Sequence, residues 1–198
     1  MDERIDLIRS LVIDSIQTKE KLLTNNDIIE RTSYAAKLIC RTLRNGGKVV
    51  LAGNGGSASD CLHIAGEIVG RFQKERKPWP AVVLNADVAT MTAIANDYGY
   101  DEIFARQVEG HINAGDIFVG ISTSGNSENI IKAIEKAHEL GGIVVGFMGK
   151  DGGKMKNICD VSLIVPSNVT ARIQESHIML GHIICDLVEK EMTGEMNE

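Results

Sequence analysis

The sequence predicts an α/β fold in three layers, in which a five-stranded parallel sheet lies between helices and further helices lie at both ends of the chain. Five short runs are rich in Val and Ile, and helical segments alternate with them. Hydrophobic residues make up 43% of the 198 positions and charged residues 24%, as in ordinary soluble globular proteins. Strands that alternate with helices in this way form a parallel sheet covered on both faces.

The first 45 residues predict two amphipathic helices, because their apolar residues recur at spacings of three, four and seven. These residues are Ile5, Ile8, Leu11, Val12, Ile16, Ile28, Ile29, Ala36, Ile39 and Leu43. Asn25, Asn26 and Asp27 supply turn and N-cap chemistry between the helices, and the Asn-Gly-Gly at 45–47 ends the second. Apolar helices at the two ends of the chain either close the fold or pair with a second subunit.

The apolar period changes after residue 47, where the sheet is predicted to begin. The predicted strands are residues 48–52, 81–84, 117–121, 143–147 and 161–165. Among the connecting segments, residues 88–95 predict a helix and another begins near Glu128. A last helix is predicted over residues 170–192, just after Pro166 and Ser167.

The length and the absence of linkers or repeats predict one domain over residues 1–198. Residues 1–45 would form its N-terminal helices. Residues 46–198 would form the α/β core and the C-terminal helix.

The composition argues against several classes of function. A net charge of −6, no Lys/Arg runs, and only four Phe, three Tyr and one Trp do not suit nucleic acid. No apolar stretch approaches the roughly 20 residues that cross a bilayer. The four cysteines show no C-x-x-C spacing, and the chain opens with Met-Asp-Glu-Arg instead of a basic leader. We therefore expect a cytoplasmic protein with reduced thiols.

A glycine-rich loop at residues 53–59 directly follows the first predicted strand. Ligands of parallel sheets bind at the carboxyl ends of strands, and glycines let the backbone approach an anion at a helix start. The alternative is a simple tight turn. Gly53, Gly55 and Ala58 also match the dinucleotide fingerprint G-x-G-x-x-A, but the candidate ribose acid, Asp87, lies 34 residues after Gly53 instead of about 20.

A serine-rich loop at residues 122–127 follows the third predicted strand. Ser122, Thr123, Ser124 and Ser127 place four hydroxyls in six residues around a glycine. Such a neutral cup of donors suits a phosphate monoester. The alternative is an N-capping serine with polar neighbours, for which one hydroxyl would suffice.

His63 and Glu67 lie four residues apart on the helix that follows the glycine-rich loop, and therefore on one face of it. An imidazole and a carboxylate at this spacing can bind a divalent metal or act as an acid/base pair. The alternative is a solvated surface pair. Because the helix starts at the loop, its early turns are expected to face the ligand.

Gln174 and His182 are polar positions in the apolar last helix. They lie about 12 Å apart along that helix and about 80° apart around it. They can share one metal only if both side chains reach inward, or if different subunits contribute them.

The segment at residues 96–100 follows the predicted helix 88–95 and contains Asn96 and Asp97. It is expected to be a loop over the site. The alternative is an Asx-type turn that caps a helix beginning near Asp101.

Five segments together resemble a known family. They are GNGGSASDCLHIAGEIVGRF at 53–72, AIANDYGYDEIFARQVE at 93–109, GISTSGNSENIIKAI at 120–134, GKDGGKM at 149–155 and ARIQESHIMLGHIICDLVEKEM at 171–192. In this order and spacing they resemble the sugar isomerase (SIS) domain, and specifically the bacterial phosphoheptose isomerases.

The resemblance implies a single flavodoxin-like SIS domain assembled as a homotetramer. It also implies isomerisation of sedoheptulose 7-phosphate to D-glycero-D-manno-heptose 7-phosphate, the first step toward the heptose of lipopolysaccharide or capsule. The partner is then a small sugar phosphate, with no role for nucleic acid or membranes.

The resemblance further implies roles for individual residues. One zinc ion per subunit would be held by His63, Glu67, Gln174 and His182. Substrate contacts would come from Asn54, Gly55, Gly56, Ser57, Glu67, Asn96, Asp97, Ser122, Thr123, Ser124, Ser127 and Gln174. The acid/base pair would be Glu67 and His182. Some members have an aspartate where this chain has Ala171, and an alanine side chain offers no group for a sugar hydroxyl.

Non-catalytic members of the family, such as the replication-initiator-associating protein, form the alternative hypothesis. They share the Ala-Arg-Ile-Gln-Glu stretch but lack counterparts of Glu67, Ser124 and His182. This chain has all three, which favours an enzyme over a protein that only binds a sugar phosphate or a replication-initiation partner.

Isomerisation of a ketose to an aldose moves a proton from C1 to C2 through an enediol. This requires a base, a group that handles the oxygen protons, and stabilisation of the developing oxyanion. We expect Glu67 to be the base and His182 its partner, with a divalent metal polarising the carbonyl.

Overall fold

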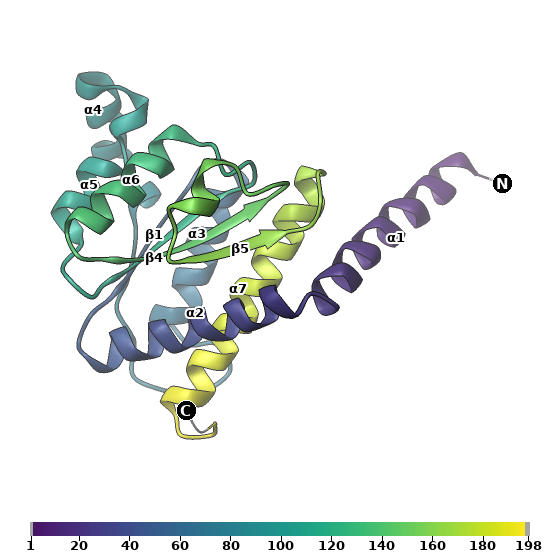
Figure 1. Cartoon of the computed structure of the whole chain (residues 1–198), viewed down its shortest axis with the longest axis horizontal. Coiled ribbons are helices and arrows are strands. Elements are labelled where there is room, and N and C mark those ends of the chain that lie inside the picture. The colour runs from purple at the N-terminus through teal and green to yellow at the C-terminus, as the bar shows by residue number, and fades with distance from the viewer. Residues whose placement is uncertain (1, 197–198) are drawn as a thin grey trace.

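The computed structural model describes residues 2–196 and contains a parallel sheet with helices on both faces (Figure 1). The strands are β1 (Val49–Gly53), β2 (Ala81–Val83), β3 (Ile117–Ser122), β4 (Ile143–Gly149) and β5 (Val161–Val165). Their order is β2-β1-β3-β4-β5, and all neighbouring pairs are parallel. This is the flavodoxin-like order, in which the direction of winding reverses between β1 and β3. The predicted three-layer α/β fold is confirmed.

The helices match most of the predicted ones. They are α1 (Glu3–Leu23), α2 (Asn26–Arg44), α3 (Gly56–Val69), α4 (Val88–Tyr98), α5 (Ala105–His111), α6 (Glu128–Glu139) and α7 (Thr170–Met192), with short 3-10 helices η1 (Leu84–Ala86), η2 (Tyr100–Glu102) and η3 (Lys154–Asn157). Asn25 caps α2 by accepting the backbone N–H of Ile28 at 3.3 Å, as its residue type predicted. Among residues 2–196, no helix is long and apolar enough to cross a membrane.

Alternate residues of the central strands face two hydrophobic clusters. In β1, Val49 and Leu51 belong to the cluster that includes residues of α2, α3 and α7, whereas Val50 and Ala52 belong to the cluster that includes residues of α5 and α6. Because side chains alternate along a strand, a strand that is apolar at every position must be buried on both faces. Helices α3 and α7 therefore lie on the same face of the sheet, where they pack together.

Helix α1 projects away from the body for most of its length (Figure 1). Its C-terminal part is anchored by buried Leu22, and Ser15 donates a hydrogen bond to Glu175 of α7 at 2.8 Å. The exposed apolar side chains of α1 are Ile5, Leu7, Ile8, Leu11, Val12, Ile13, Ile16 and Leu23. Of the two roles considered for the end helices, α2 and α7 close the fold, whereas α1 leaves an apolar face uncovered.

The end of α4 differs from the prediction. Asn96 and Asp97 lie in its last turn instead of forming a loop, and the helix ends only at Gly99, whose φ is +97°. The helix expected near Asp101 is instead η2, and α5 begins at Ala105. The prediction was wrong because an Asn-Asp pair ends a helix only when the following backbone leaves the helical region.

His177 of α7 is fully buried in the core. Its Nε2 lies 3.0 Å from the carbonyl oxygen of Met148, so Nε2 carries the proton and donates it. Nδ1 makes no hydrogen bond to any described residue, and the ring packs edge-on against Phe147. Burial lowers the pKa of His177 to about 4, because a charged imidazolium would lose its hydration.

We predict that the stability of the chain falls as the pH decreases from about 6.5 toward about 4. In this range His177 binds a proton in the unfolded chain but not in the folded one, so acidification favours unfolding. This group alone should lower the free energy of unfolding by roughly 2 to 3 kcal/mol.

Urea titrations of metal-free protein across this pH range will measure the loss of stability. His177→Gln keeps a donor for Met148 but does not titrate, so its stability should depend less steeply on pH. The same pH dependence in the variant and the wild type would contradict the assignment to His177.

Candidate active site

The glycine-rich loop lies at the carboxyl end of β1. Gly53 pairs in register with Ile121 of β3, which places this loop beside the serine-rich loop. Gly55 has a φ of +56°, and a side chain on Gly53 would meet the backbone of Ser57. Residues 56–59 of the predicted loop form the first turn of α3. A helix N-terminus that the backbone approaches this closely is suited to an anion.

The serine-rich loop gathers its hydroxyls in one place. Ser122 Oγ lies 2.8 Å from Ser127 Oγ and 3.4 Å from Ser124 Oγ. Ser127 occupies the N-cap position of α6, yet its side chain makes no capping hydrogen bond. The hydroxyls of Ser122, Ser124 and Ser127 therefore lie together, and Ser124 Oγ also accepts the backbone N–H of Asn126 at 3.2 Å. Thr123, which lies between Ser122 and Ser124 in the sequence, is half-buried.

A third loop, residues 149–155, supports the serine-rich loop. The backbone N–H of Met155 donates to the carbonyl of Gly125 at 3.0 Å, and that of Gly149 donates to the carbonyl of Thr123 at 3.2 Å. A side chain on Gly125 would meet the backbone of Gly152, so the two loops pack with no room for one. From the sequence, residues 149–155 were notable only for their resemblance to the SIS domain family.

Asn129 and Tyr100 both contact Asn54 of the glycine-rich loop; Asn129 was missed by sequence reasoning, whereas Tyr100 ends the segment 96–100 that was expected to lie over the site. Asn54 and Asn129 exchange hydrogen bonds through their amide groups at 2.9 and 3.0 Å, and the Tyr100 hydroxyl donates to Asn54 Oδ1 at 2.8 Å. Asn129 is a buried amide in the first turn of α6, but it follows Asn126, Ser127 and Glu128 in the sequence, so no local signal distinguishes it. Nothing in the local sequence of Tyr100 indicates its contact with Asn54.

His63, Glu67 and His182 converge within this one chain. The Nε2 atom of His63 lies 3.1 Å from both Glu67 Oε1 and His182 Nε2, and the three ligand atoms all lie within 4.8 Å of one another. Ligand atoms about 2.1 Å from a tetrahedral zinc ion are separated by about 3.4 Å. The cluster therefore fits one such ion, with the side chain of Glu67 22% exposed and that of His63 50% exposed.

The packing of α3 against α7 produces this convergence. The apolar face of α3, which includes Ile64, is buried on the sheet and against α7, so His63 lies at the edge of the helix contact. A side chain on Gly181 would meet Ile64, so glycine at this position lets the helices approach closely. His182 is the next residue after Gly181, and the centroid of its ring lies 4.8 Å from the centroid of the His63 ring.

The other sequence-predicted residues lie outside this cluster. Gln174 of α7 lies against Gly56 at the start of α3, where its amide fills the space that a side chain at position 56 would need. Asn96 and Asp97 are exposed on α4, where Asn96 Nδ2 donates to Asp97 Oδ1 at 2.8 Å. The structure thus brings three of the four expected metal ligands together and places Gln174 at the other end of α3.

Asp87 was the candidate ribose acid of the dinucleotide alternative. It is instead the N-cap of α4, where it accepts the backbone N–H of Thr90 at 3.1 Å and the hydroxyl of the same residue at 2.5 Å. Its carboxylate oxygens accept hydrogen bonds from the first turn of α4, so Asp87 is not placed as the ribose-binding acid of a dinucleotide site.

Comparisons with known proteins identify the family of this chain. The SIS domain family matches residues 13–149. The phosphoheptose isomerase of Clostridium acetobutylicum is 50% identical over 190 residues, which is 96% of this chain and 97% of that protein. That of Sulfurimonas denitrificans is 49% identical over 188 residues, or 95% and 96% of the two chains.

Two solved structures show the same fold at high coverage. The phosphoheptose isomerase of Francisella tularensis has a TM-score of 0.91 at 40% identity, covering 95% of this chain and 99% of that one. The enzyme of the same name from Neisseria gonorrhoeae has a TM-score of 0.88 at 42% identity, covering 93% and 98%. The chain therefore belongs to the SIS domain family and, within it, to the phosphoheptose isomerases.

Proposed function

We propose that this chain isomerises sedoheptulose 7-phosphate to D-glycero-D-manno-heptose 7-phosphate, the first step toward the heptose of lipopolysaccharide or capsule. The observation that carries the proposal is the convergence of His63, Glu67 and His182 in a chain that is 50% identical to a phosphoheptose isomerase over 190 residues. This reaction needs a base, a second proton carrier and a phosphate site, and the chain has candidate groups for each.

The phosphate of the substrate binds in the serine-rich loop. Its donors are Ser122, Thr123, Ser124 and Ser127, joined by Asn54, Gly55, Gly56 and Ser57 of the glycine-rich loop. Asn96, Asp97 and Gln174 contact the sugar. The close grouping of the serine hydroxyls supports this placement. Local hydroxyl and N–H donors determine phosphate affinity, so the net charge of −6 does not prevent binding.

Glu67 acts as the base that takes the proton from C1 and returns it to C2. His182 moves the proton between the two oxygens, so that the C2 carbonyl becomes a hydroxyl while the C1 hydroxyl becomes an aldehyde. Both side chains meet at His63, which supports their action on one substrate. A positioned carboxylate and imidazole are suited to these transfers near neutral pH.

One zinc ion per subunit would be held by His63, Glu67 and His182, with Gln174 as the fourth ligand once its amide turns from Gly56 toward the cluster. Two imidazoles, a carboxylate and an amide oxygen form a donor set that zinc accepts. When bound, the ion supplies a Lewis acid for the substrate carbonyl. A carboxylate that ligates a metal is a weaker base, so the two roles of Glu67 belong to different stages of turnover.

The chain works as one SIS domain over residues 1–198, assembled as a homotetramer in the cytoplasm. The uncovered apolar face of α1 supports the assembly, because contiguous apolar surface of this kind marks interfaces between subunits.

The base assignment predicts a selective loss in Glu67→Gln. An amide cannot accept the C1 proton, so conversion should fall by about 10²- to 10⁴-fold while the fold and phosphate binding are kept. Deuterium wash-in at C1 in D₂O, measured together with zinc content, will separate loss of the base from loss of the metal, because added zinc should rescue only the latter.

Glu75→Gln is the matched control, because Glu75 is 92% exposed and lies eight residues away. It should exchange and convert at the wild-type rate. Undiminished wash-in by Glu67→Gln would remove Glu67 from the role of base.

The phosphate site predicts weaker substrate binding by Ser124→Ala. Loss of one hydrogen bond to a charged group should reduce affinity by roughly 10- to 150-fold, with little change in melting temperature. Calorimetry with substrate or inorganic phosphate will measure this. Thr42→Val is the control, because it removes a hydroxyl that donates to the carbonyl of Gly115 at 2.9 Å, near the amino end of β3. Equal phosphate affinity in Ser124→Ala and the wild type would place the phosphate elsewhere.

A further inference from the structure

The segment between α3 and β2 has no regular secondary structure over residues 71–80, yet its backbone is held tightly by one buried carboxylate. Glu189 of α7, which is 2% exposed, accepts the backbone N–H groups of Phe72, Gln73 and Lys74 at 3.1, 2.7 and 2.9 Å. Arg76 adds a fourth hydrogen bond from Nε at 3.0 Å. Burial raises the pKa of Glu189, but these donors outweigh it and hold the pKa below its usual range. Glu189 is therefore a charged and fully satisfied anchor.

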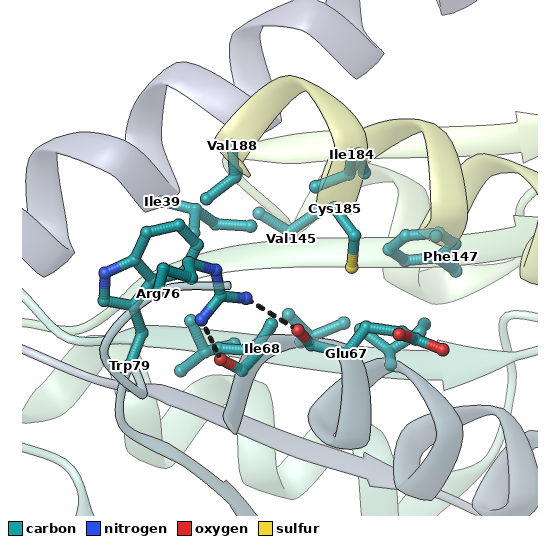
Figure 2. Close-up of a pocket in the computed structure, with 14 residues that line it drawn as sticks. Ile39, Glu67, Ile68, Arg76, Trp79, Val145, Phe147, Ile184, Cys185 and Val188 are labelled. Atoms are coloured by element: carbon teal, nitrogen blue, oxygen red, sulfur yellow. Dashed lines mark hydrogen bonds between the residues drawn. The ribbon is translucent and has the colours of Figure 1, made fainter. Parts of the chain in front are cut away.

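Arg76 extends this anchor to the turn of α3 that carries Glu67. Its Nη2 donates to the main-chain carbonyl of Glu67 at 2.8 Å, and its Nη1 donates to that of Ile68 at 3.0 Å. Helix α3 ends at Val69, so these carbonyls have no partner within the helix. The guanidinium also lies 3.5 Å from the ring centre of Trp79. Figure 2 shows the Arg76 guanidinium beside the last turn of α3, with both carbonyl contacts dashed.

The apolar contact between α3 and α7 does not fill the space at this level. A small cavity of about 20 Å³ lies between the helices and the sheet. Glu67, Ile68, Arg76, Cys185 and Val188 are among the residues that line it (Figure 2). Residues that line a void lose packing contacts on that side, and Ile64 and Gly181 of the helix contact are also among the lining residues. The hydrogen bonds of Arg76 span the same gap with defined geometry.

Glu189 lies seven residues after His182 on α7, which is two helical turns and therefore the same face of the helix. The chain of contacts thus runs from the face of α7 that carries His182, through Glu189 and Arg76, to the main chain of Glu67. We propose that Arg76 and Glu189 are positioning residues that set the separation of Glu67 from His182. This inference rests on the proposed function, because the distance between Glu67 and His182 matters only if both groups act on one substrate.

The test uses substitutions that change the bridge with little change in volume. Arg76→Lys keeps a positive charge beside Glu189, but a single ammonium cannot reproduce the planar fork that holds two carbonyls and stacks on Trp79. Glu189→Gln keeps the shape and removes the charge. Both variants should bind zinc about 10- to 100-fold more weakly, the range seen when groups that orient metal ligands are lost. Their kcat should fall, whereas KM and the affinity for inorganic phosphate should stay within about twofold, because the serine-rich loop does not contact the bridge.

Asp116→Asn is the matched control. Asp116 is also 2% exposed and accepts the backbone N–H groups of Lys48 and Asn113 at 2.9 and 2.8 Å, together with Lys48 Nζ at 2.5 Å. It directly precedes β3, at the amino ends of the strands, whereas the candidate site lies at their carboxyl ends. Asp116→Asn should lower the melting temperature as Glu189→Gln does, but it should leave zinc affinity and kcat unchanged.

Zinc affinity by competition with a chromophoric chelator, kcat, KM and melting temperature will be measured for all four proteins. Wild-type zinc affinity and kcat in both Arg76→Lys and Glu189→Gln would overturn the inference, as would an equal loss of both in Asp116→Asn. A wild-type protein that binds zinc but converts no substrate would overturn the proposed reaction instead, and the zinc affinities would still test the positioning.

Discussion

Helices α3 and α7 lie on the same face of the sheet and meet where Gly181 faces Ile64. The candidate catalytic groups depend on this contact, because one helix carries His63 and Glu67 and the other carries His182. A Cβ atom at position 181 would lie 2.7 Å from Ile64 Cδ1 and 2.9 Å from Ile64 Cγ1, so the Ile64 side chain or the helices would have to shift. The site is therefore only as well defined as the packing of two helices that are distant in sequence.

The two halves of the candidate site are built by different means. The anion loops are local structures: glycine conformations, short hydrogen bonds and the register of β1 with β3 determine their shape. The His63, Glu67 and His182 cluster is non-local and depends on side-chain packing with hydrogen bonds from Arg76 at its base. Small changes in core packing are thus expected to affect the catalytic half before the phosphate half.

Much of the fold followed from apolar periodicity, since the period of a segment reports which of its faces are buried. The candidate site was predictable to the extent that its signals were local, as with the hydroxyls around Ser124 and the spacing of His63 and Glu67. The contacts of Asn129 and Tyr100 with Asn54 were missed because Asn54 lies 75 and 46 residues away from them in sequence. The end of α4 was misplaced because it depends on the backbone conformation of Gly99.

The sequence by itself determined the strands, the end helices and the two loops that lead from strands into helices, because each depends on residue types that are near neighbours in the chain. It left open whether His63 and His182, 119 residues apart, belong to one site within one subunit. Spacing along a helix defines direction around that helix only. The tertiary structure decided the question, because the distance and angle between α3 and α7 arise from packing against the shared sheet and from the bridge of Glu189 and Arg76.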